Sequence, residues 1–216
     1  MKFYIDGCNE RAIELAEKFN LGITTNPSII LRDRTAESLE EVIRRLGNAN
    51  VPQVFIHLEG FERKIVDLLE PSKFVIKLSW IEEKHDLAFR FREAGFRVCA
   101  TAVYTPQQFL TSAILGVDYT AFYFDRSKRK GFDPRGMLSQ LVSLSNRFAG
   151  KPAIVVASLK NFEQLREAID SGANHFTLPV ELFEQLLRED EVARNDACEF
   201  QKNFEKLVQQ TLRSQG

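Results

Sequence analysis

Residues 73–79 read Lys-Phe-Val-Ile-Lys-Leu-Ser, a short β-rich run with a lysine near its carboxyl end. Side chains alternate between the two faces of a strand, so Phe74, Ile76 and Leu78 form one apolar face. In a barrel that face suits the surrounding helices, which leaves Lys77 directed toward the barrel axis. The run therefore predicts a strand that carries a lysine on its inner side.

Seven similar runs occur elsewhere in the chain and alternate with amphipathic stretches, in which apolar residues recur every three or four positions. The eight predicted strands are Lys2–Asp6, Leu21–Thr25, Gln53–Leu58, Lys73–Leu78, Arg97–Thr101, Asp118–Tyr123, Ala153–Ala157 and His175–Leu178. The predicted helices are Arg11–Phe19, Ala36–Leu46, Ile81–Ala94, Pro106–Leu115, Arg135–Phe148, Phe162–Ser171 and Val180–Arg188. Such alternation is typical of a parallel sheet.

Glycines support this division of the chain, because Gly22, Gly95, Gly116 and Gly172 each fall where a helix should end before the next strand. Eight units could close into a barrel or form an open, doubly wound sheet. No glycine-rich phosphate loop of the GxGxxG or GxxxxGK[ST] type follows any strand, which disfavours the nucleotide-binding open sheets. We therefore predict an α/β fold, a single (β/α)₈ TIM barrel.

A long polar helix, Asp196–Arg213, follows the eighth unit and exceeds what a barrel needs. Its apolar residues Phe200, Phe204 and Leu207 lie on one face. The helix could pack on its own barrel or on a neighbouring subunit, and the sequence favours neither. Because no Pro-, Gly- or Ser-rich linker interrupts the chain, residues 1–216 are predicted to form one domain.

Charge and composition disfavour several classes of protein. The formal net charge of −1 gives no global basic field for nucleic acid or an anionic membrane, so we expect neither as a partner. Cys8, Cys99 and Cys198 lie far apart without CxxC spacing, which favours a reducing compartment. No apolar segment suits a signal peptide or a membrane span, so a soluble, cytoplasmic protein is expected.

Polar residues recur at the carboxyl ends of the predicted strands, the end at which barrel enzymes carry their chemistry. The inward-facing set is predicted to be Asp6, Thr24, Asn26, His57, Lys77, Thr101, Tyr123 and Ser158. Each has an ordinary explanation when taken alone, such as a solvated lysine, a helix cap or an Asn-Pro turn. Their convergence on one end of seven strands favours a catalytic site.

This set suits an amine nucleophile. A lysine surrounded by barrel side chains loses hydration, so its neutral form can attack a carbonyl and give an imine, an electron sink for C–C cleavage. Asp6, His57, Thr101 and Tyr123 could move the protons, directly or through water. The three histidines form no HxH or HxxxH pair, so we expect neither a metal site nor a cofactor.

A phosphate group has a predicted site close by. Arg126 is expected to close the sixth strand segment, and Ser158 and Lys160 follow the seventh strand. Phosphate sites of barrels often lie around the loops of the last two strands. The basic run Lys128–Lys130 is interpreted as a solvated surface segment.

Several motifs together resemble the small transaldolases and the related fructose-6-phosphate aldolases over essentially the whole chain. The motifs are MKFYIDG at residues 1–7, GITTNPS at 22–28, FVIK at 74–77, ATAVY at 100–104, AFYFDR at 121–126 and ASLK at 157–160. The GITTNPS segment is the most specific of them.

The resemblance implies a (β/α)₈ barrel that acts on a ketose or sugar phosphate through an imine. It implies that Lys77 is the nucleophile and that Asp6 transfers protons. Thr24 and Asn26 would contact sugar hydroxyls or the lysine, and Arg126 with Ser158 would bind phosphate. Members commonly form pentamers or decamers by exchanging the carboxyl-terminal helix, a role that would suit residues 196–213.

Two positions depart from the family pattern. His57 stands where the aldolases typically have Gln and the transaldolases have Glu, and Ser79–Trp80 follows the lysine strand where a Pro and a Thr are usual. Trp80 is expected near the mouth of the site. Tyr123 resembles the aldolase branch rather than the transaldolase branch, in which Phe is usual.

Two other functions remain open at this point. The departures at His57 and Trp80 are compatible with a non-catalytic, sugar-phosphate-binding barrel. An isomerase or epimerase that uses Asp6 and His57 as acid and base is a third hypothesis, and it would not need Lys77.

Overall fold

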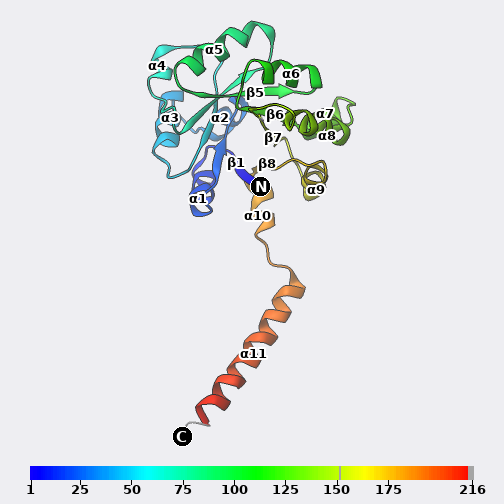
Figure 1. The fold of residues 1–216 in the computed structure, drawn as a ribbon. Helices are drawn as coiled ribbons and strands as arrows, with labels where there is room; N and C mark the ends of the chain where they lie inside the picture. The colour runs from blue at the N-terminus through cyan, green and yellow to red at the C-terminus, as the bar shows by residue number, and fades with distance from the viewer. Residues whose placement is uncertain (151, 214–216) are drawn as a thin grey trace. The chain divides into compact units, whose positions relative to one another are not determined.

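The protein is described by a computed structural model that covers residues 1–150 and 152–213. Eight parallel strands pair in chain order and close into a barrel (Figure 1). The strands are β1 Lys2–Asp6, β2 Gly22–Thr24, β3 Val54–His57, β4 Phe74–Ser79, β5 Arg97–Val103, β6 Tyr119–Tyr123, β7 Ala153–Ala157 and β8 His175–Pro179. The predicted TIM-barrel fold with a long carboxyl-terminal helix is therefore confirmed.

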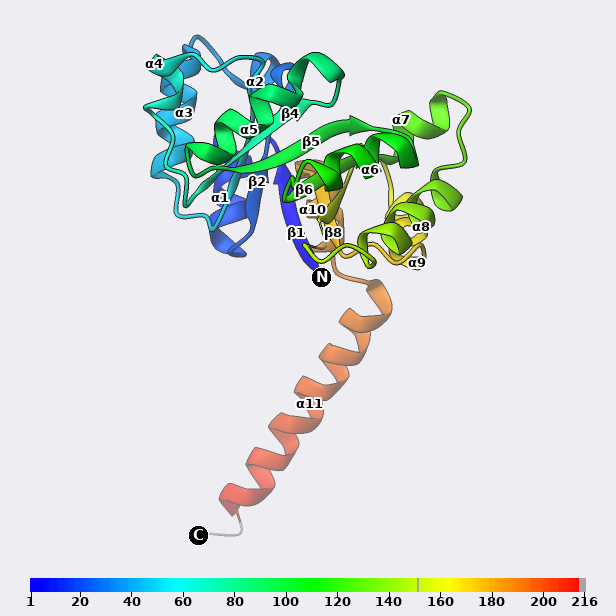
Figure 2. The ribbon, with the colours of Figure 1, turned by 45° about the horizontal axis from the view of Figure 1, so that its top comes forward.

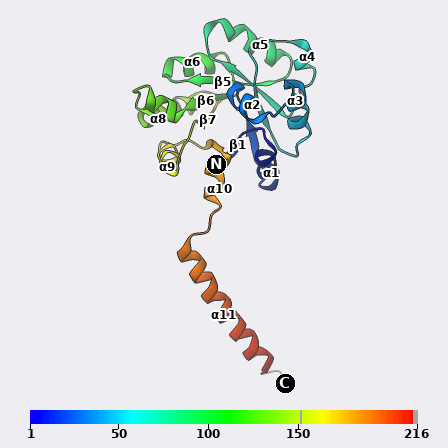
Figure 3. The same cartoon turned by 180° about the vertical axis from the view of Figure 1, so that it is seen from behind.

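Helices connect the strands and surround the barrel, so α1 and α3 lie on one flank and α8 and α9 on the opposite one (Figures 1 and 3). The helices are α1 Glu10–Lys18, α2 Pro27–Asp33, α3 Leu39–Asn48, α4 Arg63–Val66, η1 Glu82–Lys84, α5 His85–Glu93, α6 Pro106–Ile114, α7 Phe124–Arg129, α8 Pro134–Ser145, α9 Phe162–Asp170, α10 Val180–Leu186 and α11 Glu191–Arg213. Figure 2 shows the same ring of helices from a second direction.

Each predicted strand overlaps an observed one, but three short helices were not predicted: α2, α4 and α7. An Asn-Pro turn was one explanation considered for the segment around Pro27. It is a helix with Pro27 in its first turn, and the Asn26 side chain caps it by accepting a hydrogen bond from the Ile29 amide. Proline suits the first turn, where its missing N–H has no helical partner to lose.

Apolar side chains form two separate layers. The outer layer lies between strands and helices and includes Phe74, Ile76 and Leu78, so the predicted outward face of β4 is confirmed. The inner layer fills the barrel and includes Val75, the neighbour of Lys77 on the inward face. This two-sided burial is what a parallel barrel requires of its strands.

Aromatic rings close the inside of the barrel below the polar residues. The Tyr4 and Phe55 ring centroids are 5.1 Å apart and those of Phe55 and Tyr119 are 5.0 Å apart, both edge to face. The Gln53 side-chain amide donates a hydrogen bond of 3.0 Å to the Tyr119 hydroxyl. These contacts make the barrel interior a packed core rather than a pore.

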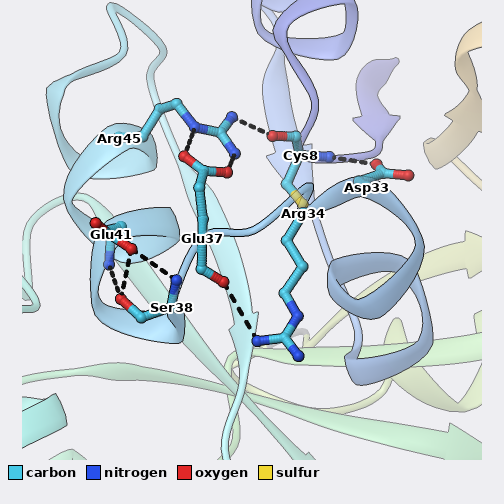
Figure 4. A network of polar contacts seen from close by, with 7 residues as sticks. All are labelled: Cys8, Asp33, Arg34, Glu37, Ser38, Glu41 and Arg45. Carbon is cyan, nitrogen blue, oxygen red and sulfur yellow. Dashed lines mark hydrogen bonds and ion pairs between the residues drawn. The ribbon is translucent and has the colours of Figure 1, made fainter.

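A polar network ties the loop after β1 to α2 and α3 (Figure 4). The Arg45 guanidinium holds both carboxylate oxygens of Glu37, at 3.0 and 2.7 Å, and also donates to the Cys8 carbonyl. The Cys8 amide donates 2.9 Å to the Asp33 carboxylate, whose side chain is 2% exposed. Charge-assisted bonds of this kind fix the backbone that follows Asp6.

The glycine predictions are correct at three positions of four. Gly95, Gly116 and Gly172 adopt φ values of +85°, +73° and +87°, the left-handed conformation of a helix C-cap. Gly22 was wrong, because it is the first residue of β2, and Asn20 takes the left-handed position with φ of +51°. Gly22 is needed for space, since a Cβ atom there would come within 2.6 Å of the Tyr4 ring.

The chain divides into two units, Met1–Phe183 and Glu184–Gly216. The second contains α11, which begins at Glu191 rather than at the predicted residue 196. Its side chains Phe200, Phe204 and Leu207 are 60–70% exposed. No helix in the described ranges has the length and apolar character that crossing a membrane requires.

Candidate active site

The carboxyl ends of the eight parallel strands meet at one end of the barrel, here called the carboxyl rim. Most of the predicted site residues lie on or beside it. Asp6, Thr24, His57 and Tyr123 end their strands, Lys77 and Thr101 lie two residues before the ends of β4 and β5, and Asn26 and Ser158 follow β2 and β7. Their positions along the chain therefore place these residues at one end of the barrel.

Lys77 is the most deeply buried cationic side chain at the rim, with 4% of its surface exposed. Its Nζ donates a hydrogen bond of 2.7 Å to the carbonyl oxygen of Thr25. Thr25 is itself fixed, because its hydroxyl donates 2.9 Å to the Phe55 carbonyl. Since a buried polar group is costly without a partner, this carbonyl holds the amine in one position.

Asp6 and Thr24 form a second group on the neighbouring strands. The Thr24 hydroxyl donates 2.9 Å to the Asp6 carboxylate and also contacts the Thr177 hydroxyl of β8. Desolvation by the surrounding protein raises the pKa of Asp6, while the positive charge of Lys77 acts in the opposite direction. Burial has the larger effect, so the pKa of Asp6 lies above its usual value.

Thr101 and Tyr123 lie together on β5 and β6, with 3.0 Å between their hydroxyl oxygens. Both are buried, at 2% and 7% exposure. The pairing of β5 with β6 shifts register just beyond Thr101, and Ala102 adopts φ of +59° there. A residue other than glycine pays about 1 kcal/mol for this conformation, and such strain is often found at functional sites.

His57 lies beside Lys77 in the strand register and contacts a residue that the sequence did not single out. Its Nε2 atom meets the Glu59 carboxylate, to which the Ser79 hydroxyl also donates, at 2.7 Å. Burial lowers the pKa of His57, and Lys77 lowers it further, whereas Glu59 raises it. An acidic residue two positions after a strand-end histidine was the available signal for this pair.

Arg126 does not close the sixth strand as predicted, because β6 ends at Tyr123 and Arg126 lies in α7. The reason is local: Phe124 packs in the outer layer and starts a helix at once. The guanidinium nevertheless stays at the rim, 4.6 Å above the centre of the Tyr123 ring. A cation over an aromatic face is favourable and holds the exposed side chain over the site.

Ser158 and Lys160 lie on the loop after β7. Ser158 adopts φ of +64°, so strand alternation does not decide where its side chain points. Its carbonyl accepts a 3.2 Å hydrogen bond from the Asp125 amide at the start of α7. The Lys160 side chain is exposed, and the Lys160 backbone amide donates a 2.9 Å hydrogen bond to the side-chain oxygen of Gln164 in α9.

The expectation for Trp80 was wrong. Its side chain is 3% exposed and belongs to the outer apolar layer, with its ring 4.8 Å from that of His85. Its backbone amide bonds the Thr101 carbonyl, so β4 and β5 stay paired one residue past Ser79. Like Leu78 two residues before it, Trp80 points away from the barrel axis and packs in the outer apolar layer behind the carboxyl rim.

A family model described as transaldolase/fructose-6-phosphate aldolase matches residues 62–215. The chain belongs to this family. The matched part contains Lys77, Thr101, Tyr123 and Arg126, whereas Asp6 lies before it. As a member of the transaldolase/fructose-6-phosphate aldolase family, the chain is a barrel enzyme of the aldolase type.

Among solved structures, thiamine phosphate pyrophosphorylase from Pyrococcus furiosus is similar, with a TM-score of 0.57 and 14% identity. The match covers 82% of this chain and 85% of that chain. At such identity the likeness concerns the fold alone. Within residues 1–150 and 152–213, no three His, Cys, Asp or Glu side chains converge as a set of metal ligands.

Replacing Asp6 with asparagine should stabilise the fold at pH 7. A carboxyl group whose pKa is raised on folding destabilises the folded state at any pH above its unfolded pKa, and this penalty fades as the pH falls through the folded pKa. The isosteric amide still accepts from Thr24. We expect Asp6→Asn to raise the free energy of unfolding on the order of 1 kcal/mol at pH 7 and by less at pH 5.

Urea unfolding followed by circular dichroism at both pH values measures this. Asp67→Asn is the matched control, because the Asp67 side chain is 63% exposed. A destabilised Asp6→Asn protein at pH 7 would mean that the attraction to Lys77 outweighs the desolvation of the carboxyl group.

Proposed function

We propose that this protein makes or breaks a C–C bond of a ketose, in most cases a ketose phosphate, through an imine formed on Lys77. The observation that carries the proposal is the buried amine of Lys77 at the carboxyl rim, the same end of the barrel at which Asp6 ends β1. The carbonyl of Thr25 can only accept hydrogen bonds, so it draws one N–H of Lys77 toward itself and fixes the position from which the nitrogen would attack a carbonyl carbon.

In the cleavage direction the reaction needs a base and an electron sink. The amine nitrogen attacks the keto carbon, and loss of water gives an iminium ion. A base then removes the proton of the hydroxyl group two carbons away, the C–C bond breaks, and its electron pair moves to the iminium nitrogen to form an enamine. Asp6 is suited to be this base, because burial raises its pKa toward the working range of an acid–base group.

The enamine must afterwards take up a proton on carbon or attack an aldehyde. The hydroxyls of Thr101 and Tyr123, 3.0 Å apart, are suited to hold a water or an aldehyde oxygen over the Lys77 adduct. Protonation from water releases a three-carbon ketone, which is aldolase activity. Capture by an aldehyde acceptor transfers the dihydroxyacetone unit, which is transaldolase activity.

The far end of a sugar phosphate would meet a cationic part of the rim. Arg126 above Tyr123 and Lys160 after β7 supply positive charge, and Ser158 supplies a hydroxyl. Thr24 and Asn26 are suited to contact sugar hydroxyls. Since Arg126 presents several donors in a planar group, it can bind phosphate oxygens in pairs.

The family match covers the Lys77 strand and the proposed phosphate residues, which favours the enzyme over the non-catalytic barrel. Two buried thiols, Cys8 and Cys99, are unpaired, which is compatible with the cytoplasm as the place of action.

Borohydride reduction tests the imine. Protein incubated with dihydroxyacetone or fructose 6-phosphate and then reduced should carry one stable adduct on the peptide that contains Lys77, read by peptide mass. Lys77→Met should carry none and should lose activity by at least about 10³-fold, because the covalent route is absent. Lys128→Met is the control, since Lys128 is exposed in α7 and should not alter the adduct.

Absence of an adduct with several ketoses would favour the sugar-phosphate-binding barrel. An active Lys77→Met protein would favour the isomerase or epimerase hypothesis.

The two branches of the family can be separated with two assays. Because the hydroxyls of Tyr123 and Thr101 can hold a water, we expect fructose 6-phosphate alone to be cleaved by the wild-type protein. Tyr123→Phe should lower this cleavage by about 10-fold to 100-fold and lower transfer to erythrose 4-phosphate by less. Equal loss in both assays would mean that the hydroxyl serves a step that the two reactions share.

We further propose that the protein is a homo-oligomer, a pentamer or decamer, assembled through α11. Phe200, Phe204 and Leu207 are largely exposed on α11, and Val208 and Leu212 of the same helix are exposed as well. Phe204→Asp would place a charge within this apolar face, so it should lower the oligomer mass measured by analytical ultracentrifugation. Lys202→Asp, on the same helix but outside the apolar set, should not change the mass, and equal effects of both would contradict the proposal.

A further inference from the structure

Glu59 is the meeting point of three side chains at the carboxyl rim. Its Oε1 atom contacts His57 Nε2 and accepts a 2.7 Å hydrogen bond from the Ser79 hydroxyl. Its Oε2 atom lies 3.2 Å from Lys84 Nζ, which also donates 2.5 Å to the Glu59 carbonyl. The Glu59 carboxylate therefore joins the end of β3, the end of β4 and the η1 helix that follows it.

This arrangement is unusual for a carboxylate whose side chain is 51% exposed. A carboxylate at such exposure is commonly solvated, and a single surface ion pair would do little to hold it. Burial alone would raise the pKa of Glu59, but hydrogen bonds from His57, Ser79 and Lys84 together hold it at about 2. The carboxylate is thus ionised at neutral pH and fixed in one orientation by three donors from three segments.

An ionised Glu59 decides which nitrogen of His57 carries the proton. A carboxylate can only accept, so in the neutral imidazole Nε2 must be the protonated nitrogen and Nδ1 keeps its lone pair. The ring is 8% exposed, so it cannot easily turn into solvent. His57 and Lys77 pair in register on β3 and β4, so the two residues are direct neighbours across the strands.

We propose that Glu59 is a positioning residue that holds His57 as the Nε2–H tautomer, so that Nδ1 exchanges a proton with the oxygen that leaves and returns at the Lys77 imine. This inference rests on the proposed function, because it concerns a step that exists only if Lys77 forms an imine. It assigns roles to Glu59, Ser79 and Lys84 that neither the strand pattern nor the family match assigns.

The step balances as an exchange of one proton. In the forward direction the carbinolamine C–O bond breaks, the hydroxyl takes the Nδ1 proton of protonated His57 and leaves as water, and the nitrogen lone pair forms the C=N bond. In the reverse direction neutral His57 takes a proton from water through Nδ1 as the water oxygen bonds to the iminium carbon. Glu59 gains and loses no proton in either direction.

The charges that face His57 come from three elements. Lys77 on β4 and Lys84 at the end of η1 lower the pKa of the imidazole, in addition to the larger effect of burial, and Glu59 on the loop after β3 opposes them. Removing the charge of Glu59 should therefore lower the pKa of His57 further. If Glu59 only tied two loops together, the pKa of His57 would still fall, but the pH dependence of kcat would not follow it.

Glu59→Gln tests the proposal, because the amide oxygen can still accept from Nε2 while the charge is gone. We expect kcat to fall by about 10-fold with KM nearly unchanged. The acid limb of the pH–kcat profile reports the neutral His57 that hydrolysis of the imine requires. This limb should move to lower pH by about half a unit to one unit, because the pKa of His57 falls. Glu59→Asp, which keeps the charge, should return the limb toward its wild-type position.

Glu62→Gln is the matched control, an exposed glutamate on the same loop that should leave both kcat and the pH limb unchanged. Thermal unfolding of each variant checks that the fold is retained. Borohydride trapping on each variant keeps two failures apart. If the adduct forms on Lys77 but the acid limb of the pH–kcat profile of Glu59→Gln stays at the wild-type pH, only the role of Glu59 is overturned. No adduct in the wild-type protein overturns the proposed function, and the role of Glu59 with it.

Discussion

The hydrogen bond between the Lys77 amine and the Thr25 carbonyl joins β4 to the end of β2 across the mouth of the barrel, and the other site residues take their places around it. A buried amine is tolerated only where an acceptor meets it, and this acceptor exists only if the barrel is closed and in register. The Phe55 carbonyl holds Thr25, and the aromatic rings of the inner layer support Phe55 from below. The packing of the barrel interior thereby sets the position of the Lys77 amine.

Under the proposed function, two acid–base groups at the rim serve that amine, and they lie on different strands, β1 and β3. Asp6 on β1 has its pKa raised by desolvation and bonds the hydroxyl of Thr24. His57 on β3 contacts the carboxylate of Glu59 on the following loop. Burial therefore has the largest effect on the pKa of Asp6, whereas the Glu59 carboxylate raises the pKa of His57 against the effect of its burial. In the proposed mechanism Asp6 and His57 are two proton carriers with different environments, which allows several proton transfers at one pH.

Strand alternation predicted much of this site, because a barrel strand is buried on both faces and a slip of one residue would exchange them. Phe74 and Ile76 fixed the outward face of β4, and Lys77 followed as inward. Alternation carries no information once a strand ends. Arg126 was expected at the end of the sixth strand but lies in α7. Ser158 itself adopts the left-handed backbone conformation, with φ of +64°. Glu59 lies on a loop that is held by contacts with Ser79 and Lys84. Those positions are set by tertiary contacts that local sequence does not encode.

The central claim is that Lys77 at the carboxyl rim bonds the substrate carbon. The most direct measurement is a crystal structure of the protein after borohydride reduction in the presence of dihydroxyacetone. The account predicts continuous density from Lys77 Nζ to the central carbon of the ketone, with its hydroxyls toward Asp6 and toward the Thr101–Tyr123 pair. A ketone bound beside an unmodified Lys77, or an adduct on a different lysine, would contradict it.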